Sequence, residues 1–225
     1  MKHALDHAYP DSEFQVYIVD DNLQIRLSMS FILDSFGIPH RIFDSGEDFL
    51  GNLAALPPGP VLLDIRMSGI DGIEVLAALA ERGVKWPVIM MTGHGDVAVA
   101  VTAMKMGAIE FLEKPFNPET LIESLTRGFE ILSQVSQVEH EQAAARSRLA
   151  ALTPRESDVV HSLIDGSANK IVAYKLGLSP RTVEMHRANA FAKLGLRSVA
   201  DLIRVVSAAG TAAAARIDVR ASLSH

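Results

Sequence analysis

Residues 61–72 read VLLDIRMSGIDG, and this stretch decides the fold of the first part of the chain. It opens with three apolar residues and then reaches Asp64. A short run without polar interruption is typical of a strand that is buried on both faces of a parallel sheet. A carboxylate at the end of such a strand lies at the edge where open α/β sheets bind their ligands.

Four further apolar runs predict four more strands: QVYIVD (15–20), RIFD (41–44), VIMM (88–91) and EFLEK (110–114). Between the runs, apolar residues recur with helical spacing, as at Val97, Val101 and Met104. Strand and helix alternate five times, which indicates a parallel sheet covered by helices on both faces.

Polar side chains follow four of the predicted strands at their carboxyl ends. They are Asp20 and Asp21 after the first strand, Asp64 after the third, Thr92 after the fourth and Lys114 after the fifth. Any one of these residues alone is as well explained by a cap or turn. Together, the carboxylates favour a hard cation such as Mg²⁺, and one carboxylate can act as a nucleophile toward phosphorus. The hydroxyl and the ammonium group can bind phosphoryl oxygens.

Four segments carry a resemblance to a known family: VDD (19–21), DIRMSGIDG (64–72), MMTGHGD (90–96) and EKPF (113–116). In this order they resemble the receiver domain of two-component response regulators, over residues 14–132. The resemblance implies a flavodoxin-like α/β domain with a five-stranded parallel sheet of order 2-1-3-4-5. It also implies that Asp64 accepts a phosphoryl group from a sensor histidine kinase.

The same resemblance implies roles for the neighbours of Asp64. Mg²⁺ would be held by Asp20, Asp21, Asp64 and the backbone carbonyl of Arg66, while Thr92 and Lys114 would sense the phosphoryl group. Phe111 stands where the family places an aromatic switch, and the bond between Lys114 and Pro115 is expected to be cis. Ser68 departs from the family, which usually has proline after Met67, and this departure bears on the rigidity of the loop.

A haloacid-dehalogenase-like phosphotransferase is the rival interpretation, since it also uses an aspartate at a strand end. That family needs a second aspartate two residues later as acid and base, and Arg66 occupies this position. We therefore expect no enzyme activity beyond self-phosphorylation from a phosphodonor and slow autodephosphorylation at Asp64.

Charge is divided unequally along the chain. Residues 1–150 contain 11 Lys and Arg against 21 Asp and Glu, a net charge of −10, whereas residues 151–225 contain 10 against 6, a net charge of +4. The basic end is the candidate for nucleic-acid binding. Cysteine is absent, which excludes disulfides and cysteine-based zinc sites. No apolar run reaches the roughly 18 residues of a membrane span, and we expect a cytoplasmic protein with no membrane partner.

Residues 133–150 are polar and free of glycine and proline, which predicts a helical linker that continues the preceding helix. Thr153, Pro154 and Glu156 then form the signature of a capped helix start. Further caps divide the segment from Pro154 to Val206 into four helices, and residues 208–225 are predicted to be a disordered tail.

This basic segment, residues 151–207, is similar to the LuxR-type helix-turn-helix domain, an all-α domain of four helices. The similarity rests on LTPRE (152–156), Asn169-Lys170, LGLS (176–179), RTVEMH (181–186) and KLG (193–195). Together with the receiver it gives the domain order of the FixJ/NarL family, and the chain is most like FixJ. The plainer alternative is a surface helix with solvated charges.

The similarity makes residues 180–194 the recognition helix. The residues implied to face bases are Glu184, Met185, Ala188 and Asn189. Those implied to face the DNA backbone are Lys170, Arg181, Thr182, His186, Arg187 and Lys193.

The sequence thus predicts a two-component response regulator that acts as a transcription factor. Phosphorylation of Asp64 is expected to promote formation of a homodimer. This dimer is expected to bind double-stranded promoter DNA and to activate transcription together with RNA polymerase. The alternative is a regulator whose output domain works by protein contact, with the receiver as a phosphate sink.

Overall fold

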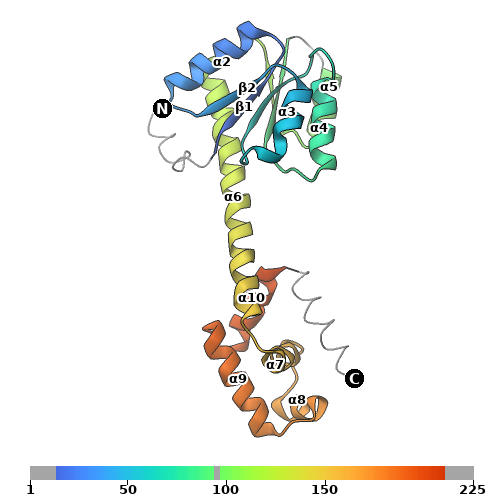
Figure 1. Cartoon of the computed structure of the whole chain (residues 1–225), viewed down its shortest axis with the longest axis vertical. Helices are drawn as coiled ribbons and strands as arrows, with labels where there is room; N and C mark the ends of the chain where they lie inside the picture. Colours follow the sequence, from blue (N-terminus) through green and yellow to red (C-terminus); the bar gives the residue numbers. More distant parts are fainter. Residues whose placement is uncertain (1–13, 94–96, 211–225) are drawn as a thin grey trace. The chain divides into compact units, whose positions relative to one another are not determined.

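The structure is a computed structural model that describes residues 14–93 and 97–210 (Figure 1). The chain divides into two compact units, Met1–Val135 and Ser136–His225. Most of the predicted tail, residues 211–225, lies outside the described residues.

The first unit is built on a parallel sheet. Its strands are β1 (Val16–Val19), β2 (His40–Phe43), β3 (Val61–Asp64), β4 (Val88–Thr92) and β5 (Glu110–Glu113). Among the described residues they form one sheet in the order β2-β1-β3-β4-β5. The predicted fold and strand order are therefore confirmed, and each predicted strand differs from the observed one by at most one residue at either end.

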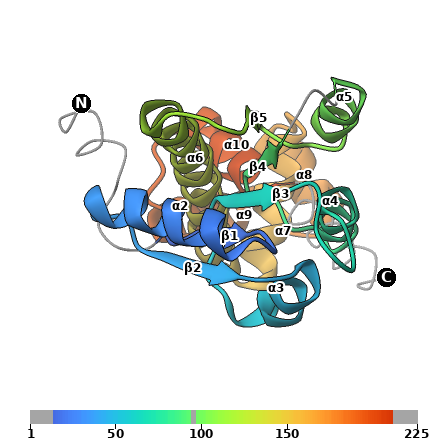
Figure 2. The ribbon, with the colours of Figure 1, turned by 90° about the horizontal axis from the view of Figure 1, so that it is seen from above.

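Helices cover both faces of this sheet (Figure 2). On one face, α2 (Leu23–Ser35) and the first part of α6 (Pro118–Ala150) pack on residues such as Ile18 and Leu62. On the other face, α3 (Gly46–Asn52), the short 3-10 helix η1 (Leu53–Ala55), α4 (Gly72–Glu81) and α5 (Val97–Lys105) enclose residues such as Val19 and Leu63. Every residue of β1 and β3 is buried, which explains the unbroken apolar runs.

The second unit consists of α-helices. After the last part of α6 come α7 (Pro154–Ile164), α8 (Asn169–Leu176), α9 (Pro180–Leu194) and α10 (Val199–Ala209). Their core includes Val159, Val172, Val183 and Leu202. The four predicted helices are confirmed within the described residues, as is the capping box of Thr153 and Glu156. The turn into α9 needs a left-handed residue, which Gly177 supplies with φ of 63°.

The end of α6 belongs to the packing of the second unit. Leu149 contacts its core, and Ala145 is buried. The guanidinium group of Arg146 donates to the carbonyl of Ala209 at 2.9 Å, and that of Arg148 donates to the carbonyl of Leu194. Both carbonyls lie at helix C-termini, where the backbone has no helical donor left. The two arginines therefore close the ends of α10 and α9.

None of the described helices combines the length and the apolar character that a membrane crossing requires.

Candidate functional site

Three carboxylates meet at the carboxyl edge of the sheet, as predicted. Asp20, Asp21 and Asp64 each offer an oxygen, and these atoms lie within 4.8 Å of one another. Asp20 and Asp64 are buried, while Asp21 is exposed. Three converging carboxylates with one side open to solvent match the oxygen ligands and partial hydration that Mg²⁺ prefers. These residues therefore fit a magnesium ion.

Lys114, at the carboxyl end of β5, brings an ammonium group to this cluster. Its Nζ lies 2.6 Å from Asp20 Oδ2 and 2.7 Å from Asp64 Oδ1. Burial raises the pKa of Asp64, the Lys114 ammonium opposes this rise, and the charges of Asp20 and Asp21 add to it. Negative charge thus exceeds positive charge at this edge. The peptide bond between Lys114 and Pro115 is cis, as predicted.

Thr92 ends β4 beside this cluster. The residue is only 1% exposed, and its hydroxyl has no hydrogen-bond partner among the described residues. A buried hydroxyl without a partner costs about 1–3 kcal/mol, so such groups are rare unless a ligand uses them. The Thr92 hydroxyl is therefore suited to an incoming polar group.

Phe111 and Arg66 take the places expected from the sequence, on β5 and on the loop after β3. Phe111 pairs in register with Met90 of β4 and packs, partly buried, against the core under α4 and α5. Arg66 is exposed in the loop that follows Asp64. Its carbonyl remains a predicted ligand.

Three contacts of this site were not anticipated from the sequence. The Ser68 backbone N–H donates to Asp21 Oδ2 at 2.8 Å, and the Ile70 N–H donates to Glu47 Oε1 at 3.0 Å. Arg26 donates to the backbone carbonyl of Asp20 at 2.7 Å. The only advance signal was the unusual serine at position 68; nothing in the sequence pattern marked Glu47 or Arg26.

On the second unit, the predicted recognition helix is α9, with the predicted bounds. The four residues assigned to bases are all exposed, and the spacing of Glu184, Met185, Ala188 and Asn189 puts them on one face of the helix. The opposite face, with Val183, Ala190 and Leu194, is buried in the core. The helix therefore offers one continuous face to a ligand.

The residues assigned to the DNA backbone divide into two groups. Lys170 and Arg181 are exposed, and Thr182, His186 and Arg187 are half-buried. Lys193 differs, because its Nζ lies 2.7 Å from Oε2 of the buried Glu156. Lys193 therefore contacts the start of α7, and its side chain is still 41% exposed, so its contact with the DNA backbone stays a prediction.

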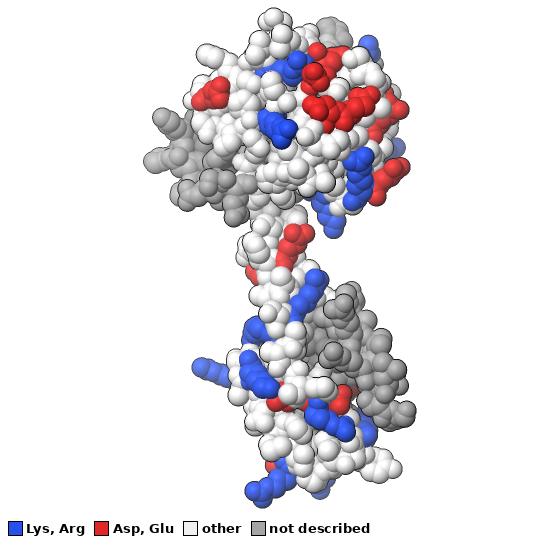
Figure 3. All heavy atoms as spheres, viewed as in Figure 1, with Lys and Arg blue, Asp and Glu red and all other residues white. Residues whose placement is uncertain are grey.

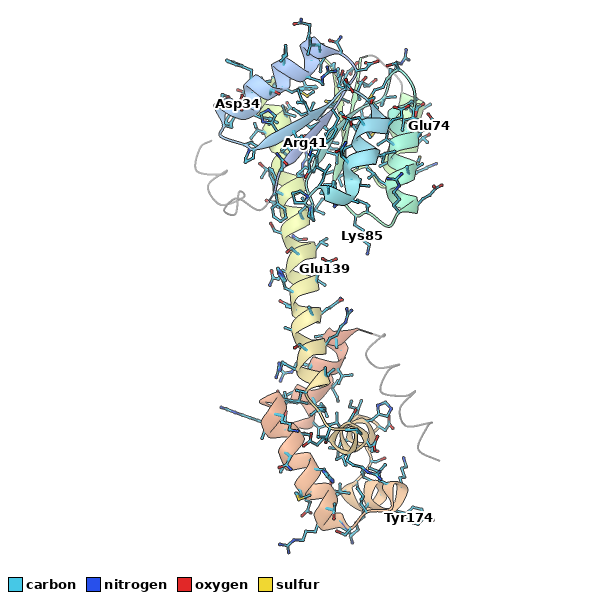
Figure 4. The ribbon with its side chains drawn as sticks, viewed as in Figure 1. Asp34, Arg41, Glu74, Lys85, Glu139 and Tyr174 are labelled. Atoms are coloured by element: carbon cyan, nitrogen blue, oxygen red, sulfur yellow. The ribbon has the colours of Figure 1, made fainter. Side chains whose placement is uncertain are left out.

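Charge is distributed differently on the two units. In the view of Figure 3, Asp and Glu gather on one part of the first unit, whereas Lys and Arg outnumber Asp and Glu among the visible charged residues of the second. On α8, Tyr174 is 89% exposed and projects away from its helix (Figure 4).

Comparisons with known proteins match both units. Residues 16–126 match the family described as the response regulator receiver domain, and residues 150–206 match the bacterial regulatory proteins of the luxR family. The transcriptional regulatory protein FixJ of Bradyrhizobium diazoefficiens is 42% identical over 198 residues, which cover 87% of this chain and 95% of that protein.

Two solved structures cover both units. A low-resolution structure of the response regulator StyR is similar with a TM-score of 0.77 at 35% identity, covering 87% of this chain and 99% of that one. Full-length FixJ from B. japonicum is similar with a TM-score of 0.56 at 38% identity, covering 89% of this chain and 98% of that one.

Proposed function

The chain belongs to the FixJ-like two-component response regulators, transcription regulators in which a receiver is joined to a LuxR-type DNA-binding domain, and we propose that Asp64 is its phosphoacceptor. Membership implies a sensor kinase as partner of the receiver and DNA as partner of the second unit. The family consists of regulators and not of conventional enzymes. The proposal concerns which residues of this chain carry out these tasks.

Asp64 is suited to attack phosphorus. Because its Oδ1 is bound by Lys114, Oδ2 is the oxygen that forms the new bond to phosphorus as the bond to the phosphodonor's leaving group breaks. Asp20, Asp21 and Asp64, with the Arg66 carbonyl, would hold Mg²⁺. When bound, this ion offsets the negative charge that the phosphoryl group brings. The same site would allow slow autodephosphorylation.

Thr92 and Lys114 are suited to hold the phosphoryl group once it is on Asp64. The Thr92 hydroxyl has no partner among the described residues and can donate to a phosphoryl oxygen, and Lys114 can pair with another as a point charge. The observation that carries the proposal is this buried, unpaired hydroxyl beside three carboxylates and one ammonium group. A shift of Thr92 and Phe111 toward the phosphoryl group would be the bistable element that phosphorylation biases.

In the second unit, α9 is suited to enter the major groove, with Glu184, Met185, Ala188 and Asn189 toward bases. The residues that would contact phosphates, and so make binding depend on salt, are Lys170, Arg181, Thr182, His186, Arg187 and Lys193. Phosphorylation would promote a symmetric dimer that reads two half-sites and activates transcription with RNA polymerase.

The test measures DNA affinity of the wild type and of Asp64→Asn, each with and without acetyl phosphate and Mg²⁺. We expect the donor to tighten binding of the wild type at least tenfold and to leave Asp64→Asn unchanged. Asp34→Asn is the matched control, because Asp34 is an exposed carboxylate on α2 (Figure 4) and should respond like the wild type.

Two results would contradict the proposal. A response of Asp64→Asn equal to that of the wild type would place the acceptor elsewhere. DNA binding that is neither selective for sequence nor dependent on salt would favour the alternative in which the output domain acts by protein contact. Size-exclusion chromatography of phosphorylated protein tests dimerisation separately; a monomer at every concentration would exclude it.

A further inference from the structure

The loop between β3 and α4 is tied to the acidic cluster by its own backbone. The Ser68 N–H donates to Asp21 Oδ2 at 2.8 Å, a contact between residues 47 positions apart in the chain. Proline, the residue expected here from the family pattern, has no N–H and could not make this bond. The departure noted in the sequence therefore adds a specific contact to the proposed metal site.

The three carboxylates of this site differ in how firmly they are held. Asp64 and Asp20 are buried and share Lys114, and Asp20 Oδ1 also accepts from the Asn22 N–H at 2.8 Å. Asp21 is exposed, so its side chain would lose the most rotational freedom on binding a cation. The bond from Ser68 to Oδ2 restrains Asp21 and leaves Oδ1 for a ligand.

The donor itself is held in place on the other side of the loop. Gly69 turns the chain with φ of +83°, and the next N–H, that of Ile70, donates to Glu47 Oε1 at 3.0 Å. A Cβ on Gly69 would lie 2.3 Å from the same oxygen, so Glu47 packs directly against the turn. The loop then ends in the capping box of Asp71 and Glu74 at the start of α4, the helix on which Figure 4 labels Glu74.

We propose that the Ser68 backbone N–H is a positioning group for Mg²⁺, which orients Asp21 so that the cluster is arranged before the ion arrives. This inference rests on the proposed magnesium site. Donors that orient metal-binding carboxylates from outside the ligand set change metal affinity by about 10–100-fold when they are lost. The same bond links the conformation of the loop 66–70 to metal binding. An ion bound to Asp21 would fix the carboxylate that accepts from the Ser68 N–H, and so would restrain the loop.

The experiment is a calorimetric titration of the full-length protein with MgCl₂, without phosphodonor, so that no phosphorylation contributes. Ser68→Pro removes the N–H and is expected to weaken Mg²⁺ binding about tenfold. Ser68→Ala keeps the N–H and is expected to bind within about twofold of the wild type, since only the hydroxyl is lost. Glu47→Ala loosens the same loop but keeps the Ser68 donor, and a smaller loss than that of Ser68→Pro is expected.

Wild-type affinity in Ser68→Pro would overturn the proposal, as would an equal loss in Ser68→Ala, which would assign the effect to the hydroxyl. A wild type that binds no Mg²⁺ would instead overturn the magnesium site itself, and the Ser68 proposal with it.

A second measurement does not depend on whether Ser68→Pro folds. Amide hydrogen exchange of Ser68, followed by NMR, should be slower in the wild type than in Asp21→Ala, because the acceptor is then absent. Equal exchange rates in the two proteins would contradict the bond on which the proposal stands.

Discussion

Both units contain a buried carboxylate paired with a lysine, Glu156 in one and Asp64 in the other, and the surroundings of these two carboxylates differ. Glu156 of the DNA-binding unit is 4% exposed and accepts from Lys193 at 2.7 Å and from the Thr153 N–H at 2.8 Å. Asp64 of the receiver is 7% exposed and shares Lys114 with Asp20. Glu156 thus has two donors for one carboxylate, whereas in the receiver one ammonium group serves two buried carboxylates.

The pKa values of the two carboxylates move in opposite directions for this reason. The Lys193 ammonium and the Thr153 amide hold the pKa of Glu156 below its ordinary value, whereas burial raises that of Asp64. A satisfied buried carboxylate stabilises its fold, whereas an undersupplied one lowers stability, a feature that is common at binding sites. Similar lysine–carboxylate chemistry thus stabilises the fold in one unit and leaves an undersupplied charge in the other.

The largest effect is expected from Glu156→Ala. It removes the side chain that bonds both Lys193 and the Thr153 N–H, and should lower the stability of the DNA-binding unit by about 2 kcal/mol, or roughly 10 °C in Tm. Circular dichroism of the full-length protein would follow this melting. Fluorescence of Trp86, the single tryptophan of the chain, reports on the receiver and should not change. A decrease in Tm seen only in the fluorescence signal would contradict the assignment of Glu156 to the stability of the DNA-binding unit.

Asp64→Asn should act in the opposite direction. Without Mg²⁺ it removes an undersupplied charge while Lys114 keeps Asp20 as partner, so the receiver should gain about 1 kcal/mol. The measurement is thermal unfolding by Trp86 fluorescence in the presence of a chelator. Destabilisation by this substitution would mean that the Lys114 bond outweighs burial.

Lowering the pH should reduce the stability difference between the wild type and each variant, Asp64→Asn and Glu156→Ala. The two differences have opposite signs at neutral pH. Asp64 has a raised folded pKa, so its unfavourable contribution is present at neutral pH and vanishes as the pH falls from that pKa to about 4. Glu156 has a lowered folded pKa, so its stabilising contribution is complete above about pH 4 and is lost as the pH falls through the folded value. Melting curves of the wild type and both variants from pH 7 to 3 would test this; variant differences independent of pH would refute it.

Thr92→Val should have a smaller effect on stability. Valine has the same shape and removes a buried hydroxyl that has no partner in the described part of the chain, so the receiver should be unchanged or more stable by up to about 1 kcal/mol. Retention of phosphorylation by acetyl phosphate with loss of the DNA response would agree with a sensing role. A clear drop in Tm would show that the hydroxyl already has a partner.

The smallest effect is expected from Arg155→Ala. Arg155 lies 3.6 Å from Asp158 on the surface of α7, one residue from Glu156, and such exposed pairs contribute about 0.5 kcal/mol or less. The variant is therefore the control for Glu156→Ala in the same melting experiment. A loss comparable to that of Glu156→Ala would assign the effect to helix α7 in general and not to the buried pair.

Features that depend on local pattern could be predicted from the sequence. The strand VLLD and the placement of Asp64 follow from a continuous apolar run that ends in a carboxylate, and α9 follows from its cap at Ser179 and the glycine at position 195. Contacts that depend on tertiary approach could not. The Ser68–Asp21 bond joins residues 47 apart and the Lys193–Glu156 pair joins residues 37 apart, and neither spacing has a sequence signature. For Lys193, position on a basic helix suggested phosphate contact but gave no sign of the ion pair with Glu156 of α7.

The two arginines near the end of α6 set where an excised DNA-binding module should begin. The match to the luxR family starts at residue 150, after Arg146 and Arg148. A fragment cut there would contain the whole family signature and lack both guanidinium groups that close α9 and α10. A cut after Val135 would keep them. The boundary of the folded DNA-binding module therefore differs from the boundary of the family match. Helix α6 supplies the end of the first module and also an integral part of the second.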